Sequence, residues 1–582
     1  MRASTLAFVG LALSLPLPAF AMQVPGEQLR LDAQKRSVPE AFRSAQFAAL
    51  RPSNVVFQPL ASTRVEAVQR ANRADGAKAL QIGINRNVAD EAESAPLGAL
   101  RWQPVRGGRV ARIDVRSPQA AALRVGIDAR SLPAGAEIRV GSGTLPQASS
   151  VNAAAALLQA DGSGVFWTAV TDGEVQQIEL FLPDGAADVL PRFVAVSHLL
   201  DSPLRPTGSF AKSLGDSGPC NIDAVCREGA LGQPYINAKN AVALLVFTSS
   251  SGTSTCTGTL LRDTVAGTQV PYFFSAAHCF VTQPVANTVL TFWNFETPSC
   301  GARLPGPNTQ VTGGADLLHA NLNSEALLLR LRPSSGLPAS AFFAGWDSGM
   351  LAANSPVVAI HHPAGDNKKF SRGVHSGNTA NHTIAGQTVT SVARASWAEG
   401  TTEGGSSGSG LFTLSNSEYL LRGGLFGGAA SCGNTGQTEA QGNVDYYSRF
   451  DQVFPAVRQW LAPANATGPT RDYTGAWFTS AEPGWGLTVF NFPGQIFALW
   501  FVYDAQGRPS WYRMQGAWTG ADTSTVALER PTGPSWATVP FNGAAVSWTP
   551  VGNATVTFTS ATAATLTFND GTVSRTVTLT KI

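Results

Sequence analysis

Charged side chains are scarce in this chain of 582 residues: Asp, Glu, Lys and Arg together make up only 14% of it, and the formal net charge is +2. Proteins that bind nucleic acid usually carry a basic face, so nucleic acid is not an expected partner. Long apolar runs are also missing after the first 21 residues. No later stretch reaches the roughly 18 uninterrupted apolar residues of a membrane-spanning helix, so a membrane span is not expected.

The first 21 residues have the pattern of a secretory signal peptide. Arg2 precedes an apolar run over 6–17, and the sequence AFA at 19–21 supplies small residues for a cleavage site. The apolar part is too short to remain in a bilayer as an anchor. We therefore expect residues 1–21 to be a signal peptide and the protein to be secreted by bacterial-type export, into the periplasm or the medium.

Cysteines are few, and all six lie between Cys220 and Cys432. An even number confined to one segment of an exported chain indicates three disulfides within one domain. Spacing alone leaves 15 alternative pairings. No CxxC pair occurs, although such pairs are common in metal sites, so neither a metal nor another cofactor is expected.

Residues 201–219 and 462–470 are rich in small residues and proline and are predicted linkers. The cysteine-free block 22–214, which ends within the first of these linkers, contains alternating apolar stretches such as RVARIDVRS (109–117) and VQQIELFLP (175–183), which are typical of an antiparallel sandwich. Its position between a signal peptide and a disulfide-bonded domain predicts a propeptide, because slowly folding β domains benefit from a covalent folding helper. The alternative is a permanent β domain.

Residues 215–461 consist of short apolar strands separated by Gly and Pro, for example AVALLVF (241–247) and TVLTFWNF (288–295). Many short strands in one segment predict a barrel or a pair of barrels. The stretch PAVRQWL (455–461) is predicted to close this domain as a short helix.

Residues 471–582 hold seven of the 13 tryptophans and no cysteine, and they are predicted to form a separate all-β module. An exposed tryptophan can stack on a sugar ring, so a polysaccharide or another surface ligand is one interpretation. The other is that these side chains fill a small β core. The whole chain is expected to be a monomer.

The sequence GGSSGSG (404–410) is the strongest candidate for a catalytic loop. A serine hydroxyl becomes a nucleophile when a base removes its proton and nearby dipoles hold the oxyanion that forms. Glycines let a backbone turn tightly and present bare N–H groups. If Ser407 is the nucleophile, the amides of Gly405 and Ser407 are placed to form the oxyanion hole. A flexible Gly/Ser loop is the alternative.

A candidate base lies upstream, in the sequence YFFSAAHCF. His278 follows an apolar strand and directly precedes Cys279, and a bridge from Cys279 to Cys256 would hold the loop that carries the imidazole. Histidine has a pKa near neutrality, which suits a general base for a serine. A structural histidine is the alternative.

The stretches TGTLL, FFSAAHC and GGSSGSG resemble the chymotrypsin-like serine peptidases, in the order His, acid, Ser. The resemblance is greater to their bacterial lysyl endopeptidase branch. Its motifs run through residues 215–461: CNIDAVC (220–226), SAAHC (275–279), AGWD (344–347), IHHPAGD (360–366), TEGGSSGSG (402–410) and DYYSRF (445–450). The combination is far more specific than any one motif.

This resemblance implies an all-β, trypsin-like fold of two six-stranded antiparallel barrels with the active site between them. It also implies the disulfides Cys220–Cys432, Cys226–Cys300 and Cys256–Cys279. The N-terminal block is similar to propeptides of related secreted enzymes. The C-terminal part resembles Trp-rich modules of exported bacterial proteins.

The family has an aspartate before an apolar strand as its catalytic acid, whereas this chain has Glu325 there, in SEALLLRL (324–331). A carboxylate at this position accepts a hydrogen bond from the imidazole and fixes its tautomer. The extra methylene of glutamate shifts the oxygens by about an ångström, and misplacements of that size can cost about a hundredfold in rate. Asp316 is the rival, but Glu325 is preferred because its spacing to AGWD fits the family.

Substrate preference follows from the same resemblance. The acid that lines the pocket of trypsin-like enzymes is replaced by Thr401, whereas Asp445 in DYYSRF matches the pocket acid of the lysyl endopeptidase branch. A buried carboxylate would favour Lys or Arg at the cleaved bond. The family also flanks its catalytic histidine with a Trp and a His. Trp397 matches the first, and Phe426 replaces the second. A surface aspartate is the alternative for Asp445.

Many animal relatives have an aspartate directly before the nucleophile, which captures a newly freed N-terminus. This chain has Ser406, whose hydroxyl cannot form that ion pair. Activation is therefore predicted to proceed by removal of the propeptide, with the mature start near Gly215. The adjacent His361 and His362 match a structural turn of the family. A metal there is disfavoured, because neighbouring strand residues point to opposite faces.

These observations predict a secreted serine endopeptidase that cleaves after Lys or Arg. Its partners would be protein or peptide substrates and its own propeptide. The alternative is a catalytically weak or inactive binding protein on a peptidase scaffold, with adhesion through the C-terminal module. An esterase is a third, weaker interpretation.

Overall fold

In the computed structural model, the described residues are those from 22 to 582 except 31–40, 48–50, 74–78, 94–99, 143–148, 187–189, 205–216, 266–267, 303–304, 464–468, 470–472, 493–494, 505, 521, 536, 538 and 570–572. The expected signal peptide at 1–21 and the expected mature start near Gly215 lie outside the described residues. So do most of the linker 462–470 and the middle of the linker 201–219.

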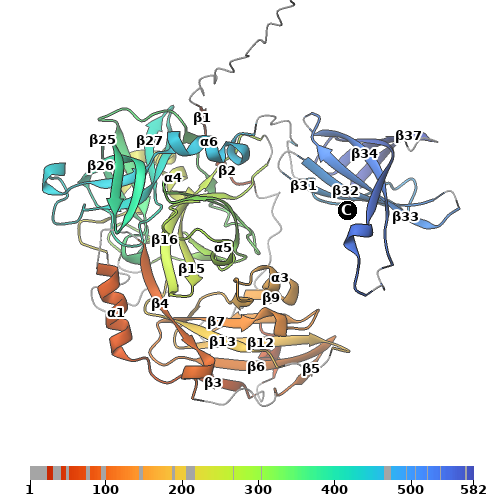
Figure 1. The fold of residues 1–582 in the computed structure, drawn as a ribbon, viewed down its shortest axis with the longest axis horizontal. Helices are drawn as coiled ribbons and strands as arrows, with labels where there is room; N and C mark the ends of the chain where they lie inside the picture. The colour runs from red at the N-terminus through yellow and green to blue at the C-terminus, as the bar shows by residue number, and fades with distance from the viewer. Residues whose placement is uncertain are drawn as a thin grey trace, which may run out of the picture.

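The chain is mostly β-strand, so the predicted all-β fold class is confirmed. Figure 1 shows three parts: an N-terminal domain drawn red to yellow, a central domain drawn green to cyan and a C-terminal barrel drawn blue. Among the described residues, no helix has both the length and the apolar character needed to cross a membrane.

The N-terminal domain is a sandwich of two layers whose strands pair antiparallel, except that β3 runs parallel to β6. The strands of the outer layer pair in the order β3-β6-β12-β8-β9, with β5 beside β6. Alternation places Ile178, Leu180 and Leu182 of β12 in the core between the layers. The outer strands are β3 (Ser53–Val56), β5 (Gln103–Val105), β6 (Gly108–Arg116), β8 (Glu137–Gly141), β9 (Ser149–Asn152) and β12 (Val175–Pro183).

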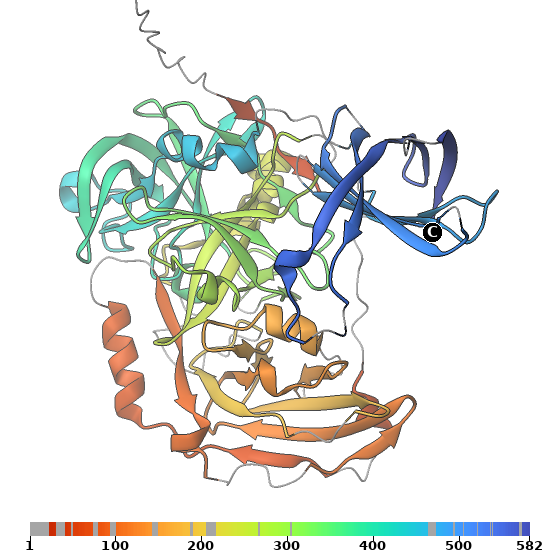
Figure 2. The same ribbon diagram turned by 45° about the vertical axis from the view of Figure 1, so that its right-hand side comes forward.

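The inner layer continues without a break into the central domain. Strand β4 pairs with β13 on one side and with β16 of the central domain on the other, which gives one 12-stranded sheet. Figures 1 and 2 both show β4 rising beside β16. The inner strands are β4 (Leu80–Asn87), β7 (Ala122–Asp128), β10 (Val165–Trp167), β11 (Thr171–Asp172) and β13 (Phe193–Leu199), and the helices are α1 (Ser62–Arg73), α2 (Val88–Glu91) and α3 (Ala153–Leu158).

The two domains share one apolar core. Leu80, Ile82 and Ile84 of β4 pack in the same buried cluster as Leu244 and Phe292 of the central domain. Burying the apolar surface of these side chains away from water is the main favourable contribution to the free energy of such a contact. The N-terminal domain is thus joined to the central one by both main-chain pairing and side-chain packing.

A buried cation also crosses this interface. Arg124 of β7 is 2% exposed and donates to the Thr248 hydroxyl (2.8 Å) and to the Thr288 carbonyl (3.0 Å) of the central domain. Burial lowers the pKa of Arg124 to about 9. Because a buried charge is costly unless it is fully hydrogen-bonded, these bonds fix the relative position of the domains.

The central domain contains two barrels. In the second, the six strands pair in a closed ring, β24-β25-β26-β29-β28-β27 and back to β24. Its strands are β24 (Pro356–His361), β25 (Lys369–Ile384), β26 (Gln387–Glu399), β27 (Gly410–Ser415), β28 (Glu418–Gly428) and β29 (Asp445–Ser448).

In the first barrel the pairing runs β20-β21-β17-β16-β15-β18-β19. Its strands are β15 (Val242–Ser249), β16 (Gly252–Leu261), β17 (Tyr272–Ser275), β18 (Leu290–Trp293), β19 (Thr309–Val311), β20 (Ala315–Asn321) and β21 (Ala326–Leu331). The helices of the domain are α4 (Glu228–Ala241), α5 (Gln283–Ala286) and α6 (Phe450–Leu461). Helix α6 contains the predicted closing helix and buries Val453, Val457 and Leu461 along one face.

The first described residues also lie on the central domain. Strand β1 (Gln23–Val24) pairs with β23 (Trp346–Asp347), and β2 (Glu27–Gln28) pairs with β22 (Phe342–Phe343). The segment that follows the expected signal peptide is thereby held at the connection between the barrels.

The C-terminal part is a closed barrel in which eight strands pair in sequence order. Trp477, Trp500 and Trp518 are at most 4% exposed and fill its core, whereas Trp511 is 38% exposed. Core filling therefore accounts for part of the tryptophan content. The strands are β30 (Gly475–Phe478), β31 (Gly486–Phe492), β32 (Gln495–Tyr503), β33 (Pro509–Ala517), β34 (Thr523–Thr532), β35 (Ser547–Phe558), β36 (Ala563–Asn569) and β37 (Ser574–Lys581).

A buried histidine makes the N-terminal domain sensitive to acid. His198 in β13 is 2% exposed, and its Nδ1 bonds to the Ser117 hydroxyl (2.8 Å), which also accepts from Arg86. Burial, together with the nearby positive charge of Arg86, lowers the pKa of His198 to about 4.

The unfolded chain therefore binds a proton at His198 more readily than the folded domain does. Neutral His198 therefore contributes to the free energy of unfolding above pH ~6.5. This contribution is lost as the pH falls to about 4, and the loss amounts to up to about 3 kcal/mol. Hydrogen exchange of the β13 amides should accelerate from pH 7 to pH 4.5, after correction for intrinsic rates, and less so in His198→Gln. His319→Gln, in the central domain, serves as the control. Equal acceleration in wild type and His198→Gln would contradict this assignment.

Candidate active site

The three residues expected to form a catalytic triad lie in contact. Nε2 of His278 is 2.7 Å from Oγ of Ser407, and Nδ1 of the same ring bonds to Oε1 of Glu325. The main-chain N–H of His278 also donates to Oε1 of Glu325 (3.1 Å). The imidazole is thus held on one side by a carboxylate while its other nitrogen faces a hydroxyl, which is the arrangement of a serine nucleophile with its base.

Each side chain is positioned by a short segment at a strand end. His278 follows β17, and its neighbour Cys279 is joined by a disulfide to Cys256 in β16. Ser407 lies in the turn before β27, and Thr257 of β16 donates its N–H to the Ser407 carbonyl (2.7 Å) and its hydroxyl to the Gly405 carbonyl (2.9 Å). Strand β16 therefore holds both the base and the nucleophile.

Glu325 directly precedes β21, has no exposed surface and has a φ of 56°. This left-handed backbone is uncommon for a residue with a Cβ. Both carboxylate oxygens are used, because Oε2 accepts a bond from Nε2 of Gln387. The rival Asp316 instead forms ion pairs with Arg330 and Arg332.

Gln387 is not among the site residues predicted from the sequence. It lies at the tip of the β25–β26 hairpin in the second barrel and also donates to the Leu322 carbonyl (3.1 Å). On the same hairpin, Thr390 donates its N–H to the Asn323 carbonyl (2.8 Å). The hairpin thus braces the segment that carries Glu325. No local pattern of residues indicates this contact, because the hairpin and Glu325 belong to different barrels.

The turn around Gly405 requires glycine. Gly405 has a φ of 93°, and a Cβ there would lie 2.6 Å from the His362 carbonyl oxygen. A side chain would push the turn away, so glycine keeps the expected oxyanion-hole amides of Gly405 and Ser407 on the loop that presents the nucleophile.

The two adjacent histidines have structural contacts. His361 bonds to the hydroxyls of Ser406 (2.8 Å) and Ser371 (3.0 Å). Nδ1 of His362 bonds to the Asp366 carbonyl (2.9 Å), and burial holds the pKa of His362 well below its ordinary value. Within the described parts of the chain, no group of three His, Cys, Asp or Glu side chains could hold a metal.

Asp445 is buried and hydrogen-bonded rather than exposed on the surface. It is 0% exposed, and its Oδ2 accepts bonds from Nε1 of Trp397 (2.7 Å) and from the hydroxyl of Thr402 (2.6 Å). Asp445 in β29 pairs with Gly428 of the adjacent strand β28. A Cβ added at Gly428 would lie 2.3 Å from Oδ1 of Asp445. Thr402 was missed in the sequence analysis, although it lies within the TEGGSSGSG motif.

Two aromatic side chains of the expected site have described contacts. Phe426 lies beside His278, with ring centroids 5.9 Å apart. Trp397 donates its Nε1–H to Asp445 and packs edge-on against Tyr447. Sequence reasoning also missed His382, whose ring stacks at 3.5 Å on Tyr446, the residue after Asp445.

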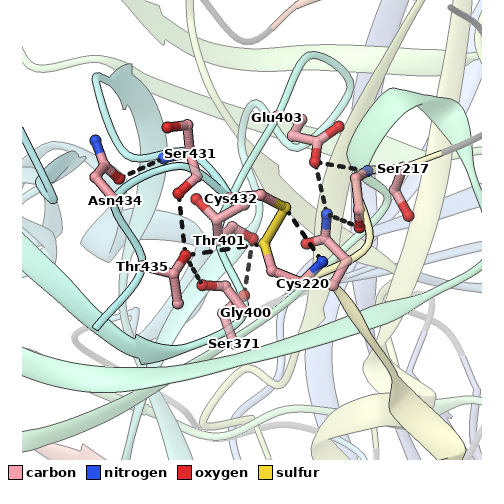
Figure 3. The surroundings of a disulfide bond; sticks show 12 residues. Ser217, Cys220, Ser371, Gly400, Thr401, Glu403, Ser431, Cys432, Asn434 and Thr435 are labelled. Carbon is pink, nitrogen blue, oxygen red and sulfur yellow. Dashed lines mark hydrogen bonds between the residues drawn. A yellow bond between two sulfur atoms is a disulfide. The ribbon is translucent and has the colours of Figure 1, made fainter. Parts of the chain in front are cut away.

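The disulfides join Cys220 to Cys432, Cys226 to Cys300 and Cys256 to Cys279, which are the pairings that the family resemblance implies. Figure 3 shows the first of them with Ser217, Thr401 and Glu403 around it. Glu403, four residues before Ser407, accepts the N–H of Gly218 (2.9 Å), and Ser217 bonds to Asp366. The start of the central domain is thereby attached to the segment that leads to Ser407.

Comparisons with known proteins cover both the N-terminal and the central domain. Residues 214–448 match the family model described as lysyl endopeptidase, C-terminal domain, and residues 56–199 match the model for the lysyl endopeptidase N-terminal domain. A lysyl endopeptidase of Pseudomonas aeruginosa is 32% identical over 460 residues, which are 76% of this chain and 94% of the relative.

Among solved structures, a protease from M. tuberculosis in its active form matches with a TM-score of 0.26 and 14% identity, over 39% of this chain and 85% of its own. The MamO protease domain from Magnetospirillum magneticum matches with a TM-score of 0.26 and 12% identity, over 38% of this chain and 97% of that domain. Likenesses at this level carry no argument. The two family models and the similarity to the curated relative over most of both chains do, and they show that this chain is a serine endopeptidase that belongs to the lysyl endopeptidase family.

Proposed function

We propose that this endopeptidase is exported and cleaves peptide bonds after lysine, or arginine, through a Ser407–His278–Glu325 triad. The observation that supports it is the continuous set of hydrogen bonds from Glu325 through His278 to Ser407. A contact between all three members favours a working enzyme over the alternative of a disabled scaffold. The signal-like first 21 residues and the three disulfides support export.

In this mechanism, Ser407 Oγ attacks the substrate carbonyl while Nε2 of His278 takes its proton. The amides of Gly405 and Ser407 hold the oxyanion of the tetrahedral intermediate. His278 then gives the proton to the leaving amine, and an acyl-enzyme remains on Ser407. Water, activated by the same histidine, releases the acid product. The carboxylate of Glu325 stabilises the imidazolium through Nδ1.

The preference for a cation is proposed from Asp445. Trp397 and Thr402 donate to one of its oxygens and hold the buried carboxylate in one orientation. A carboxylate offers about four lone-pair sites, so it can also accept from a substrate ammonium. A buried negative charge is stabilised by a cation and leaves a neutral side chain at a disadvantage. The curated relative is named for lysyl bonds.

For activation, we propose that residues 22–214 are a propeptide removed from a mature enzyme that starts near Gly215. The hydroxyl of Ser406 is bonded to His361 and to the Glu403 amide, so the turn before the nucleophile is held by internal contacts. An inserted N-terminal ammonium is not needed to form it. The domain limits 215–461 and 471–582 remain part of this proposal. So does a surface or polysaccharide ligand of the C-terminal module.

A fluorophosphonate probe should label the mature enzyme at one serine, because only a hydroxyl with an adjacent base attacks phosphorus rapidly. Ser407→Ala should lose the label, and Ser409→Ala should keep it. Mass spectrometry of the labelled peptide is the measurement. If the wild type is not labelled, the proposed enzymatic mechanism is wrong, and the alternative of an inactive binding protein on a peptidase scaffold is favoured.

Replacing Gln387 tests the support of the acid. Gln387→Ala frees one oxygen of Glu325, and the imidazole becomes less firmly held. We expect kcat on a lysyl peptide to fall about tenfold with little change in KM. Thr388→Ala, next to it in β26, is the control, because its hydroxyl contacts only Thr383 among the bonds described here. A purely structural role would instead lower thermal stability and leave kcat per folded molecule unchanged.

Cleavage-site profiling on a peptide library tests Asp445. In Asp445→Asn, the rate at lysyl bonds should fall by on the order of a hundredfold, because the cation loses its charged partner in a buried site. Asp316→Asn, which removes a carboxylate paired with Arg330, should leave the profile unchanged. If Asp445→Asn keeps the wild-type preference, the pocket acid lies elsewhere.

A further inference from the structure

The first described residues, 22–30, form a separate segment on the central domain. Strand β1 pairs antiparallel with β23, with Val24 opposite Trp346, and β2 pairs antiparallel with β22, with Gln28 opposite Phe342. Strands β22 and β23 belong to the connection between the two barrels, and residues 342–347 are here called the connector. Figures 1 and 2 both show β1 and β2 at the end of the central domain that lies away from the N-terminal sandwich.

The connector is bound to both barrels by main-chain hydrogen bonds. The N–H of Ala344 donates to the Leu260 carbonyl (2.8 Å) in the first barrel, and the Gly345 carbonyl accepts from the N–H of Leu421 (3.0 Å) in the second. Further main-chain groups of the connector are satisfied by β1 and β2. If the segment left, these groups would lose their partners, and such an edge readily accepts an added strand.

Two apolar side chains anchor the segment in two different cores. Val24 is 6% exposed and packs in the cluster that contains Trp346 and Phe454 of helix α6. Leu29 is 4% exposed and belongs to the cluster of the first barrel that contains Phe343. One short strand therefore braces the connector from both ends.

Between these anchors the two backbones are in direct contact. A Cβ added at Gly26 would lie 2.3 Å from Cε1 of Phe342, and a Cβ added at Gly345 would lie 2.2 Å from the carbonyl oxygen of Val24. The surface therefore accepts only a strand whose residue at this position has no side chain. This requirement makes the contact selective for the sequence of the segment.

Polar contacts add a charge preference. Glu27 forms an ion pair with Arg262, in which Oε2 lies 3.1 Å from Nε, and its Oε1 accepts from Nε2 of Gln269 (3.1 Å). The N–H of Gly26 donates to Oε2 of Glu418 (2.8 Å). The partner that fits the connector is thus an extended strand with an apolar residue at each end, a glycine between them and an acidic side chain after the glycine.

This surface is separate from the catalytic serine. Leu261, at the end of β16, forms a bridge with Ala344 of the connector, whereas Thr257 of the same strand holds the Ser407 turn. An extended strand rises about 3.3 Å per residue, so these two contacts of β16 lie about 13 Å apart. A strand bound to the connector therefore leaves the catalytic cleft open.

We propose that the connector is an interaction surface for an extended strand, and that residues 22–29 bind it as a separate peptide when they are not joined to the rest of the chain. The bound strand braces the two barrels and stabilises the central domain without inhibiting catalysis. This inference goes beyond the proposed function. If residues 22–214 are removed on activation, the mature enzyme presents this surface to a strand of the same kind.

The test uses the full chain with Ser407→Ala and a synthetic peptide of residues 22–29, labelled at its C-terminus. The peptide contains neither lysine nor arginine, so it cannot fill a pocket for a cation. Val24→Asp in the chain places a charge in an apolar core and should release the chain's own segment. Gln28→Asp is the matched control, because it adds the same charge at an exposed position.

Fluorescence anisotropy should show that the peptide binds the Val24→Asp chain at least about tenfold more tightly than the Gln28→Asp chain, whose own tethered segment still occupies the surface. Amide hydrogen exchange at 342–347 should be faster in Val24→Asp than in the Gln28→Asp control, and the peptide should restore the slow rate. A peptide that itself carries Val24→Asp should do neither. Unchanged exchange in the Val24→Asp chain, or equal binding to both chains, would overturn the inference.

A second variant covers the case in which Val24→Asp unfolds the second barrel, which fast exchange across β24–β29 would reveal. Glu418→Ala removes the acceptor for the Gly26 N–H, and with it exchange at 342–347 should be faster than in wild type while β24–β29 stay protected. An unchanged rate at 342–347 would contradict the proposed contact.

Failure of this inference is distinguishable from failure of the proposed function. Binding is measured on a chain without its nucleophile, so it does not depend on catalysis. The peptide should also leave the rate of the matured enzyme on lysyl substrates unchanged, and inhibition would place it in the cleft and overturn the inference. If the enzyme cleaves no lysyl bond, the proposed function is wrong, and the binding measurements still decide the inference.

Discussion

The structure depends on the bonds that strand β16 makes along both of its edges and at its end. Thr257 fixes the Ser407 turn of the second barrel through two hydrogen bonds, and Cys256 is bound to the segment that carries His278. A serine and a histidine separated by more than a hundred residues can act together only if their backbones are fixed to a common rigid element. Strand β16 is that element, and it is also the strand on which β4 of the N-terminal domain docks.

The interface between the N-terminal and central domains combines two kinds of contact. An apolar cluster stabilises the interface but does not specify how the domains are aligned. A row of hydrogen-bonded polar side chains, here called the polar chain, fixes the alignment. In that chain, the Ser197 hydroxyl bonds to Thr253, Thr253 bonds to Thr248, and Thr248 accepts from Arg124. An apolar surface alone would tolerate sliding of β4 along β16, which reverses the faces of its side chains with each one-residue shift. The polar chain selects one register.

The acid shows how a departure from a family pattern is accommodated. Glutamate at 325 carries one more methylene than the family's aspartate, and its backbone has a left-handed φ. Its longer side chain still bonds to Nδ1 of His278, and the hairpin of the second barrel holds the remaining oxygen through Gln387. Support from the opposite barrel means that the geometry of the base depends on both barrels.

The sequence by itself determined the all-β class, the order of His278, Glu325 and Ser407, and the confinement of all cysteines to one domain. The class follows from the alternation of apolar residues, and the order of the three side chains follows from motifs that resemble those of the family; both are properties of neighbouring residues. Tertiary structure alone decided that Gln387 braces Glu325, that Trp397 donates to Asp445, and that β4 lies against the catalytic turn. These contacts join residues from different barrels, strands or domains, and no local pattern encodes a contact whose partner is set by the packing of the whole chain.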